Sequence, residues 1–375
     1  MKKVYTYLYL LPFALLTGCG QKKAAEAMVI NPEKADDVMF EDVAGNIRIV
    51  PLSGDEPLYG FDYIRCYGDD VFAVDLGHEY VYYFKDGKHE STLGSIGRGP
   101  GEYITINQIL YDSERKILNL INLTSRECIM QYSVPDMKYI GKIEMPSRIE
   151  AVRFYDDNTL LVALEQDSEK GLYLFDLNTK EVKRKVCNLS QYQFTNSTLT
   201  TEGIDKDCHI ITLMGPDNAL CQVTDNGLDT LFRFNYGKEG AAQVFYGPLN
   251  SMEDADKYLE YLFSNEDKFR GCYNYHADKN GVSFWYSTLL KAKDHFHFYR
   301  LSKGVETHLQ GFNIPGLKGT LSPSCKTETG YASIVSGIVE TIADSTTAPS
   351  PLAQKIIDAV AAQPDDYPVL VYYDL

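Results

Sequence analysis

The sequence predicts an all-β protein: a six-bladed β-propeller closed by an N-terminal strand, with two short helical insertions. Three observations lead to this prediction. A short pattern of an apolar-aromatic strand followed by a polar turn occurs six times. The first copies are about 45 residues apart, which is the length of a four-stranded blade. A spare strand near the N-terminus also matches a strand that the last copy lacks.

The six copies share an apolar core and a turn rich in Asp, Asn and Gly. They are EYVYYFKDGK (79–88), CIMQYSVPDMK (128–138), LYLFDLNTKE (172–181), ALCQVTDNGL (219–228), FHFYRLSKGV (296–305) and VLVYYDL (369–375). Turns such as Asp86-Gly87 and Asn226-Gly227 favour tight hairpins. Another short strand precedes most copies, for example DVFAVDL (70–76), so each repeat holds enough strands for a blade.

Two later intervals are longer by about thirty residues, and each contains a predicted helix. In residues 251–269, Ser251 and Asp254 resemble a capping pair ahead of an apolar stripe. In residues 350–368, Ser350 is the expected N-cap and Pro351 the first helical residue. We expect both helices to cover propeller edges rather than to form separate domains.

The chain ends on the third strand of the sixth copy and so lacks the outer strand of that blade. The segment IRIVPL, Ile47 to Leu52, is a strand without a partner near the other end. Its donation to the last blade would close the ring and remove an exposed sheet edge. The predicted propeller therefore covers residues 46–375.

The N-terminus predicts export and a lipid anchor. Lys2 and Lys3 precede an apolar run of about a dozen residues, too short to span a bilayer. The run ends in Leu16-Thr17-Gly18-Cys19, which resembles the bacterial lipobox. Residues 1–18 are then a lipoprotein signal peptide, Cys19 carries the lipid, and residues 19–45 are a tether. The alternative is a buried hydrophobic N-terminal helix with a chance cysteine.

Charge limits the partners that the protein can have. The formal net charge is −16, and removal of residues 1–18 takes away two lysines and no acid, leaving −18. No run of Lys or Arg could form a basic face, so we expect no nucleic acid partner. The segment GQKKAAE after Cys19 lacks the run of acids that in some bacterial lipoproteins resembles a surface-export signal, and this favours the periplasmic side of the outer membrane.

The metal-binding residue types show no recognisable spacing. Seven cysteines follow Cys19, at positions 66, 128, 187, 208, 221, 272 and 325, and no two lie within three residues of each other. This excludes a zinc knuckle or CxxC pair, and we interpret them as small buried residues in strands. An oxidising envelope permits a disulfide, but the spacing selects no pair. His295 and His297, with Asp294, form a conceivable metal pair without a third ligand. A solvated strand face is favoured, so no metal or other cofactor is predicted.

The segment GSIGRGPGEY, Gly94 to Tyr103, raises the alternatives of a phosphate loop and a structural crossing. A P-loop needs a following Lys-Ser/Thr and a helix, whereas ITINQILYD follows here and is a predicted strand. We therefore interpret the segment as a crossing from the outer strand of the first blade to the inner strand of the second, at the rim of a binding site.

Two of these motifs carry a resemblance to a known family. GSIGRGPGEY after the first blade, and the tail QPDDYPVLVYYDL, resemble the Bacteroidetes six-bladed β-propeller lipoproteins, which are related in fold to NHL-repeat propellers. The resemblance covers about residues 46–375, with Tyr367 where that family commonly has Asn. It implies the propeller fold and a location in the cell envelope, and no established activity.

Outer-to-inner crossings open on one face of a propeller, so their residues converge at the channel mouth. The predicted binding residues there are Tyr59, Arg98, Glu102, Tyr103, Arg148, Tyr192 and Lys318. Cations in a low-dielectric mouth attract anions, and tyrosines offer stacking surfaces. We expect a ligand-binding or protein-interaction scaffold for an anionic, glycan or peptide ligand or an envelope protein.

The alternative function is a hydrolase or lyase similar to NHL and gluconolactonase propellers, with calcium or zinc in the central channel. The sequence holds no H-E-x-x-H or G-x-S-x-G motif, and no catalytic residue is identified. Binding rather than catalysis is therefore the favoured prediction.

Overall fold

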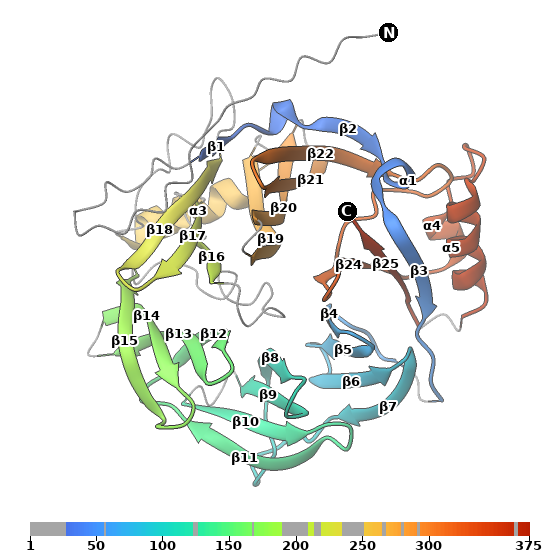
Figure 1. The fold of residues 1–375 in the computed structure, drawn as a ribbon. Coiled ribbons are helices and arrows are strands. Elements are labelled where there is room, and N and C mark those ends of the chain that lie inside the picture. Colours follow the sequence, from blue (N-terminus) through green and yellow to red (C-terminus); the bar gives the residue numbers. More distant parts are fainter. Residues whose placement is uncertain are drawn as a thin grey trace.

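The computed structural model describes residues 28–55, 58–122, 127–166, 169–189, 209–213, 219–234, 251–264, 268–278, 281–290, 293–363 and 367–375. Its strands form six sheets arranged as a ring around a central axis (Figure 1). This arrangement confirms the predicted six-bladed propeller. The predicted signal peptide, residues 1–18, and Cys19 lie outside the described residues.

Blades 1 to 3 are antiparallel four-stranded sheets whose strands follow in chain order, with the first strand nearest the axis (Figure 1). Blade 1 contains β4 (Tyr63–Tyr67), β5 (Asp70–Asp75), β6 (Tyr80–Lys85) and β7 (Lys88–Leu93). Blade 2 contains β8 (Ile106–Asp112), β9 (Ile117–Asn122), β10 (Cys128–Ser133) and β11 (Lys138–Glu144). Blade 3 contains β12 (Ile149–Asp156), β13 (Thr159–Gln166), β14 (Glu169–Asp176) and β15 (Glu181–Asn188).

Blades 4 to 6 each take one strand from the N-terminal segment of the chain. Blade 4 contains β16 (Ile210–Leu213), β17 (Ala219–Thr224), β18 (Gly227–Phe234) and β1 (Met28–Ile30). Blade 5 contains β19 (Lys268–Asp278), β20 (Gly281–Leu290), β21 (Lys293–Ser302), β22 (Val305–Asn313) and β2 (Asp36–Met39). Blade 6 contains β23 (Cys325–Lys326), β24 (Tyr331–Val335), β25 (Val369–Asp374) and β3 (Gly45–Pro51).

The N-terminal strand closes the ring as predicted. β3 pairs antiparallel with β25, with Ile49 opposite Val371, so the segment Ile47–Leu52 supplies the strand that blade 6 lacked. The structure adds two pairings that were not predicted: β1 runs parallel to β18, and β2 runs parallel to β22. These strands extend the propeller beyond the expected start at residue 46. They are held because Ile30 and Phe40 are buried in the core.

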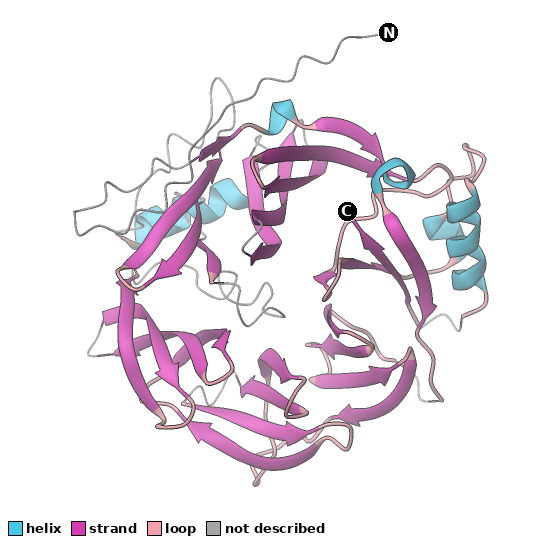
Figure 2. Cartoon of the chain, viewed as in Figure 1, coloured by secondary structure: helices cyan, strands magenta, loops and turns pink. Residues whose placement is uncertain are grey.

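The two predicted helical insertions are present at the periphery of the ring (Figure 2). α3 covers Met252–Phe263, and the Asp254 N–H donates to Ser251 Oγ at 3.1 Å. α5 covers Pro351–Ala361, and the Ala353 N–H donates to the N-cap Ser350 Oγ at 3.1 Å. The remaining helices are single turns: η1 (Pro32–Lys34), α1 (Phe40–Val43) and α4 (Val339–Ile342). No helix in the described ranges is long and apolar enough to cross a membrane.

The core lies between the blades. Successive side chains of a strand point to opposite sides of its sheet, so both sides of a blade are buried when it packs between two neighbours. Buried apolar residues of the described chain accordingly form six clusters, one at each junction of neighbouring blades. Every residue of β5 is buried, which explains its continuous apolar run. Any internal cavity must therefore lie at a junction or in the channel.

Candidate functional site

The glycine-rich segment folds back on its own glutamate. Glu102 Oε2 accepts a hydrogen bond from the Gly99 N–H at 2.7 Å, and a Cβ on Gly97 would overlap the same carboxylate. Gly101 has a φ of +79° and packs against the ring of Tyr139. The segment is followed by the predicted strand, β8. Its glycines thus allow close packing of side chains, and Glu102 has a structural role in the loop.

Tyr103 is buried at the junction of blades 1 and 2. Its side chain has no exposed surface, and its hydroxyl lies 2.6 Å from the Glu79 carbonyl oxygen and 3.0 Å from that of Leu93. Burial raises the pKa of Tyr103 above its ordinary value. In this structure the phenol joins neighbouring blades and is not accessible to a ligand.

The other predicted mouth residues are spread over the face that carries the crossings. Tyr59 is 63% exposed, and its ring lies 5.3 Å from that of His78. Arg98 and Arg148 are exposed and have no hydrogen bond or ion pair to another described residue. Lys318 Nζ donates to the Glu340 carbonyl oxygen at 2.6 Å and so ties its crossing to α4. Tyr192 lies outside the described residues.

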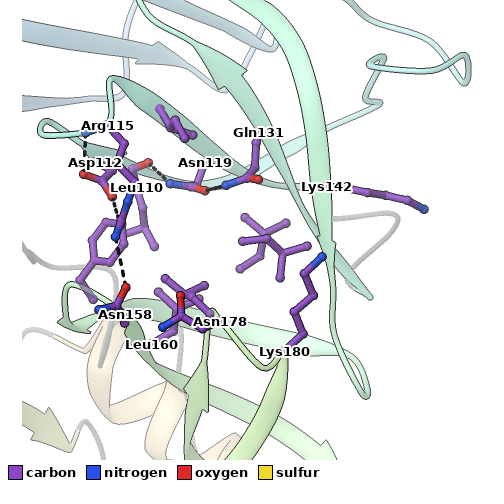
Figure 3. Close-up of a pocket in the computed structure, with 15 residues that line it drawn as sticks. Leu110, Asp112, Arg115, Asn119, Gln131, Lys142, Asn158, Leu160, Asn178 and Lys180 are labelled. Carbon is purple, nitrogen blue, oxygen red and sulfur yellow. Dashed lines mark hydrogen bonds and ion pairs between the residues drawn. The ribbon is translucent and has the colours of Figure 1, made fainter.

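A cavity of about 230 Å³ lies between blades 2 and 3. Its lining comes from all four strands of blade 2, from β12 and β13, and from two turns of blade 3 (Figure 3). The turns 113–116 and 157–158 follow the ends of β8 and β12 that are opposite to the crossings. The cavity therefore opens on the face opposite to the predicted mouth, and none of the seven predicted residues lines it.

The floor of this cavity is apolar and its rim is polar. Leu110, Ile129, Ile143, Phe154 and Leu160 are buried. The polar lining residues are Asp112, Arg115, Asn119, Gln131, Lys142, Asn158, Asn178 and Lys180. An apolar floor with a few converging polar groups is the usual composition of a small-molecule site.

Arg115 spans the junction between the two blades. Its guanidinium donates to Asp112 Oδ2 at 2.7 Å within blade 2 (Figure 3). It also donates to the Asp157 carbonyl oxygen at 2.9 Å and to Asn158 Oδ1 at 3.2 Å in blade 3. The Asp112 side chain is only 5% exposed, so this pair is better shielded from water than a surface salt bridge. Arg115 therefore fixes the width of the cavity on this side.

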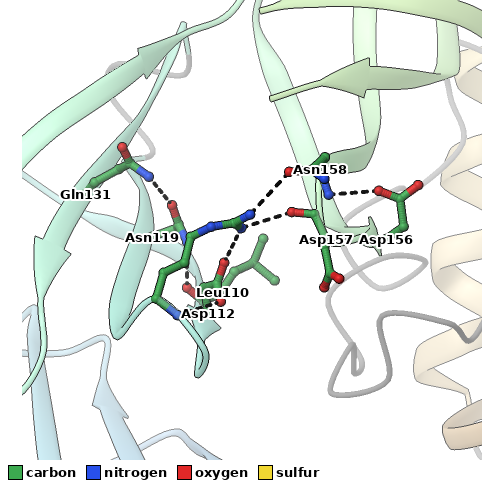
Figure 4. Close-up of polar contacts among 8 residues, drawn as sticks. Leu110, Asp112, Asn119, Gln131, Asp156, Asp157 and Asn158 are labelled. Atoms are coloured by element: carbon green, nitrogen blue, oxygen red, sulfur yellow. Dashed lines mark hydrogen bonds and ion pairs between the residues drawn. The ribbon is translucent and has the colours of Figure 1, made fainter. Parts of the chain in front are cut away.

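An amide chain forms the opposite part of the wall. Gln131 Nε2 donates to Asn119 Oδ1 at 2.9 Å, and Asn119 Nδ2 donates to the Leu110 carbonyl oxygen at 3.3 Å (Figure 4). These bonds fix the direction of both amides and leave the Gln131 carbonyl oxygen without a described partner. A carboxamide carries both donors and acceptors, so the wall suits hydroxyl or amide groups of a ligand.

The two lysines at the rim differ. Lys142 lies 2.6 Å from Glu144 Oε1 and extends away from the other labelled side chains (Figure 3). Lys180 extends from the turn between β14 and β15 toward blade 2, and its ammonium group has no ion pair with a described residue. Its backbone has a φ of +58°, and its N–H donates to the Asp176 carbonyl oxygen at 2.9 Å. Lys180 is thus the cation available to a ligand.

Sequence reasoning missed the lining residues of this cavity because they are scattered over residues 110–180. Each of them, taken alone in the sequence, resembles an ordinary surface residue of a strand or a turn. The signal that could have found them is the set of polar residues, Asn119 and Gln131, inside two otherwise apolar strands. Such residues need partners when a strand is buried on both sides.

The predicted solvated strand face at His295 and His297 is wrong for His297. His297 is fully buried in blade 5 rather than on a solvated strand face, and its Nε2 lies 2.9 Å from Thr288 Oγ1. Desolvation lowers its pKa to about 3. Among the described residues no three His, Cys, Asp or Glu side chains are placed to hold a metal ion. Six cysteines are described, all in strands and without a disulfide; Cys187 is half-buried and the other five are buried.

Comparison with solved structures shows similarity in fold. The propeller superposes on the "Putative exported protein" from Bacteroides fragilis with a TM-score of 0.63 and 11% identity, covering 93% of this chain and 100% of that one. A member of the DUF4221 family from Bacteroides vulgatus gives a TM-score of 0.52 at 9% identity, covering 88% and 97% of the two chains. No curated protein sequence matches the chain significantly.

The sequence itself matches one family model over nearly its whole length. Residues 27–374 match the model described as domain of unknown function DUF4934, a span that begins one residue before β1 and ends with β25. The chain therefore belongs to the DUF4934 family.

Proposed function

We propose that this protein is an envelope-anchored binding propeller that takes a small sugar acid in the cavity between blades 2 and 3. The single observation that supports this most is the uncommitted ammonium group of Lys180 beside a fixed amide wall and an apolar floor. The three features match the three parts of a sugar acid: its carboxylate, its hydroxyls and its apolar ring face.

Size favours a small ligand. A volume of about 230 Å³ is below the range of roughly 300–1,000 Å³ that is usual for small-molecule pockets. A single sugar unit, or the end of a longer chain, fits this limit better than an extended glycan. The exposed rim would let the rest of such a chain leave the cavity.

Electrostatics favour an anion. Arg115 is paired with Asp112, and Lys142 is paired with Glu144, so each of these cations has an internal counter-ion. Lys180 has none among the described residues. In a protein with a net charge of −16, an isolated cation over a partly shielded cavity attracts a carboxylate more strongly than the bulk surface does.

The residues favour binding over hydrolysis. A glycosidase needs two carboxyl groups on either side of the scissile bond. Asp112 is the one acid among the described lining residues, and its carboxylate is bonded to Arg115. The alternative of a metal-dependent hydrolase or lyase has no supporting residue cluster in the described part of the chain.

A binding assay with defined probes tests the proposal. Galacturonate and glucuronate are compared with galactose and glucose by calorimetry and thermal shift. The uronates are expected to bind, and Lys180→Gln is expected to weaken them at least about 10-fold, or about 1.4 kcal/mol. Lys303→Gln is the matched control, because Lys303 is exposed in the corresponding turn of blade 5 with a φ of +50°. Equal affinity for neutral sugars, or an unchanged Lys180→Gln affinity, would contradict the proposal.

The predicted channel-mouth residues stay a separate proposal. Arg98→Ala and Arg148→Ala are expected to leave uronate affinity unchanged if the inter-blade cavity is the site, because neither residue lines it. A loss of affinity in these variants, with Lys180→Gln unaffected, would place the ligand at the crossing face instead.

We also infer that Cys19 anchors the propeller to a membrane of the cell envelope, on the periplasmic side. The lipobox-like segment ahead of Cys19 supports this, and so does the similarity in fold to a protein described as exported. Cys19→Ala is expected to move the protein from the membrane to the soluble fraction and to abolish lipid labelling. A Cys19→Ala protein that still pellets with membranes and takes up label would refute the anchor.

A further inference from the structure

Two thiols meet at the junction where the ring closes. Cys66 lies on β4, the strand of the first blade nearest the axis (Figure 1), and Cys325 lies on β23, the edge strand of blade 6 opposite to β3. Both side chains are fully buried in one apolar cluster. β4 and β23 are neighbours across the junction, and the side chains of Cys325 and Cys66 are near enough to interact, as are those of Tyr372 and Cys66.

The two edges of this junction are held differently. At the outer edge, the Ser53 N–H donates to the Gly87 carbonyl oxygen at 2.8 Å, and the His89 N–H donates to that of Ser53 at 2.7 Å. This backbone bridge links the end of β3 to β7. At the inner edge, β4 and β23 belong to different sheets. The side chains of Cys66 and Cys325 pack together at this inner edge.

We propose that Cys66 and Cys325 are a modification site, at which a disulfide joins the first blade covalently to the last. Two S–H bonds break and one S–S bond forms. The two electrons and two protons reduce a disulfide oxidant, such as oxidised glutathione or a thiol oxidoreductase of the envelope. That such an oxidant is present in the cell rests on the proposed export; the reaction itself does not.

The positions of the side chains suit this bond. A disulfide needs Cβ vectors that point toward each other, with sulfurs about 2.05 Å apart. Cys66 and Cys325 meet the first condition for such a bond, because they lie on neighbouring strands and pack in the same cluster. The closed loop would span residues 66–325, which covers five of the six blades, and long loops gain the most from cross-linking.

Burial determines when the bond can form. Neither thiol has exposed surface, so an oxidant cannot reach them in the folded protein, and burial also raises the pKa of the Cys325 thiol well above its ordinary value. We therefore expect the disulfide to form during folding, before blade 6 packs on blade 1. Once formed, it is shielded from reductants by the same burial.

The test refolds the purified full-length chain from denaturant with and without a glutathione redox buffer. Free thiols are then blocked with N-ethylmaleimide in denaturant, and the chain is digested without reduction. Mass spectrometry is expected to find a linked peptide pair holding Cys66 and Cys325, and two fewer alkylated thiols. The melting temperature of the oxidised protein is expected to rise by about 5 °C.

Serine variants provide the control. Cys66→Ser and Cys325→Ser should each remove the linked pair and the rise in melting temperature. Cys272→Ser should keep both, because Cys272 is equally buried but lies between blades 4 and 5. If Cys66→Ser or Cys325→Ser fails to fold, it is replaced by Cys66→Ala, which keeps an apolar side chain. Absence of the linked pair in wild-type protein, or links to other cysteines in equal amount, would overturn the proposal. Uronate binding and membrane anchoring are independent of this outcome.

Discussion

The carboxylate of Asp70 in blade 1 lies 3.0 Å from the ammonium group of Lys116 in blade 2. The same carboxylate accepts hydrogen bonds from Tyr83 at 2.7 Å and from Tyr111 at 3.1 Å, and Lys85 lies 3.1 Å away. Asp70 is 3% exposed, so a charge buried between two blades is satisfied by groups from both. This cluster is a polar link in a junction that is otherwise apolar.

Removal of the Asp70 charge is expected to weaken this link. Asp70→Asn should lower the free energy of unfolding by about 2 kcal/mol at pH 7, since hydrogen bonds to buried charged groups contribute about 1.5–3 kcal/mol. Asp69→Asn is the matched control. Its side chain is 50% exposed and 3.7 Å from Arg48, so it should change stability by less than about 0.5 kcal/mol. Urea denaturation measures both.

The same carboxylate makes stability depend on acid. Burial alone would raise the pKa of Asp70, but the bonds from Tyr83, Lys116 and Lys85 outweigh burial and lower it. The folded protein therefore holds this proton less tightly than the unfolded chain does, and stability falls as pH drops below about 4. We expect the stability difference between wild type and Asp70→Asn to shrink between pH 5 and pH 3. A constant difference would contradict the charged state of Asp70.

The glycine segment predicts a coupled pair of substitutions. Gly97→Ala should destabilise the protein by about 1 kcal/mol, because the new methyl group would push the Glu102 carboxylate away from the Gly99 N–H that donates to it. In a Glu102→Ala background the methyl group has room, so the cost of Gly97→Ala should fall by most of that amount. Gly45→Ala is the control, since a Cβ there meets no atom within 4 Å. Additive effects of the two changes in urea unfolding would refute the close contact.

The buried histidines of blade 5 predict a second pH dependence. Desolvation lowers the pKa of His297 to about 3 and that of His308 to about 4. Between the unfolded value of about 6.5 and these values, the unfolded chain binds protons that the folded protein excludes. Stability should therefore decrease as pH falls, by up to about 1.4 kcal/mol per pH unit for each histidine.

Replacement of His308 measures its contribution to the pH dependence of stability. His308→Gln can still bond to the Tyr286 hydroxyl, which lies 2.6 Å from His308 Nε2, but does not titrate. Between pH 6 and pH 4.5, the free energy of unfolding should depend less steeply on pH. The slope should fall by up to about 1.4 kcal/mol per pH unit, which corresponds to one proton. A slope equal to that of wild type would show that His308 is not excluded from protonation.

Local chemistry explains why the fold could be predicted. Strand and turn patterns such as 79–88 need only neighbouring residues, and the spare strand Ile47–Leu52 stood out because it had no partner. β2, with the sequence DDVM, gives no such signal, because its pairing depends on the edge that β22 presents.

The cavity and the thiol pair could not be predicted for the same reason. Lys180 and Gln131 line one cavity only because blades 2 and 3 pack face to face, and Cys66 and Cys325 share one cluster only because the ring closes. Sequence spacing holds no information on such contacts. The crossing rule assigned Arg98 and Tyr103 to the same crossing, but it could not tell that Tyr103 would be buried and Arg98 exposed.

Two truncations test how the N-terminal strands hold the ring. A chain that starts at Gly45 keeps β3 and loses β1, β2 and α1, with the buried residues Ile30 and Phe40. It should fold, with a free energy of unfolding lower by roughly 3–6 kcal/mol, since burial of each of these side chains contributes about 1.5–3 kcal/mol. A chain that starts at Tyr59 also loses β3, leaving β25 as a bare edge. It should not unfold cooperatively in urea.

A peptide of residues 45–58, added to the chain that starts at Tyr59, tests whether the missing β3 alone causes the loss of cooperative unfolding. It should restore a cooperative transition by pairing with β25, where Ile49 lies opposite Val371. The same peptide with Ile49→Pro should fail, because proline cannot donate to the ladder and is confined to strand edges. If the chain starting at Tyr59 is stable and cooperative without the peptide, then β3 covers blade 6 but does not hold the ring closed, and stability resides in the apolar junctions alone.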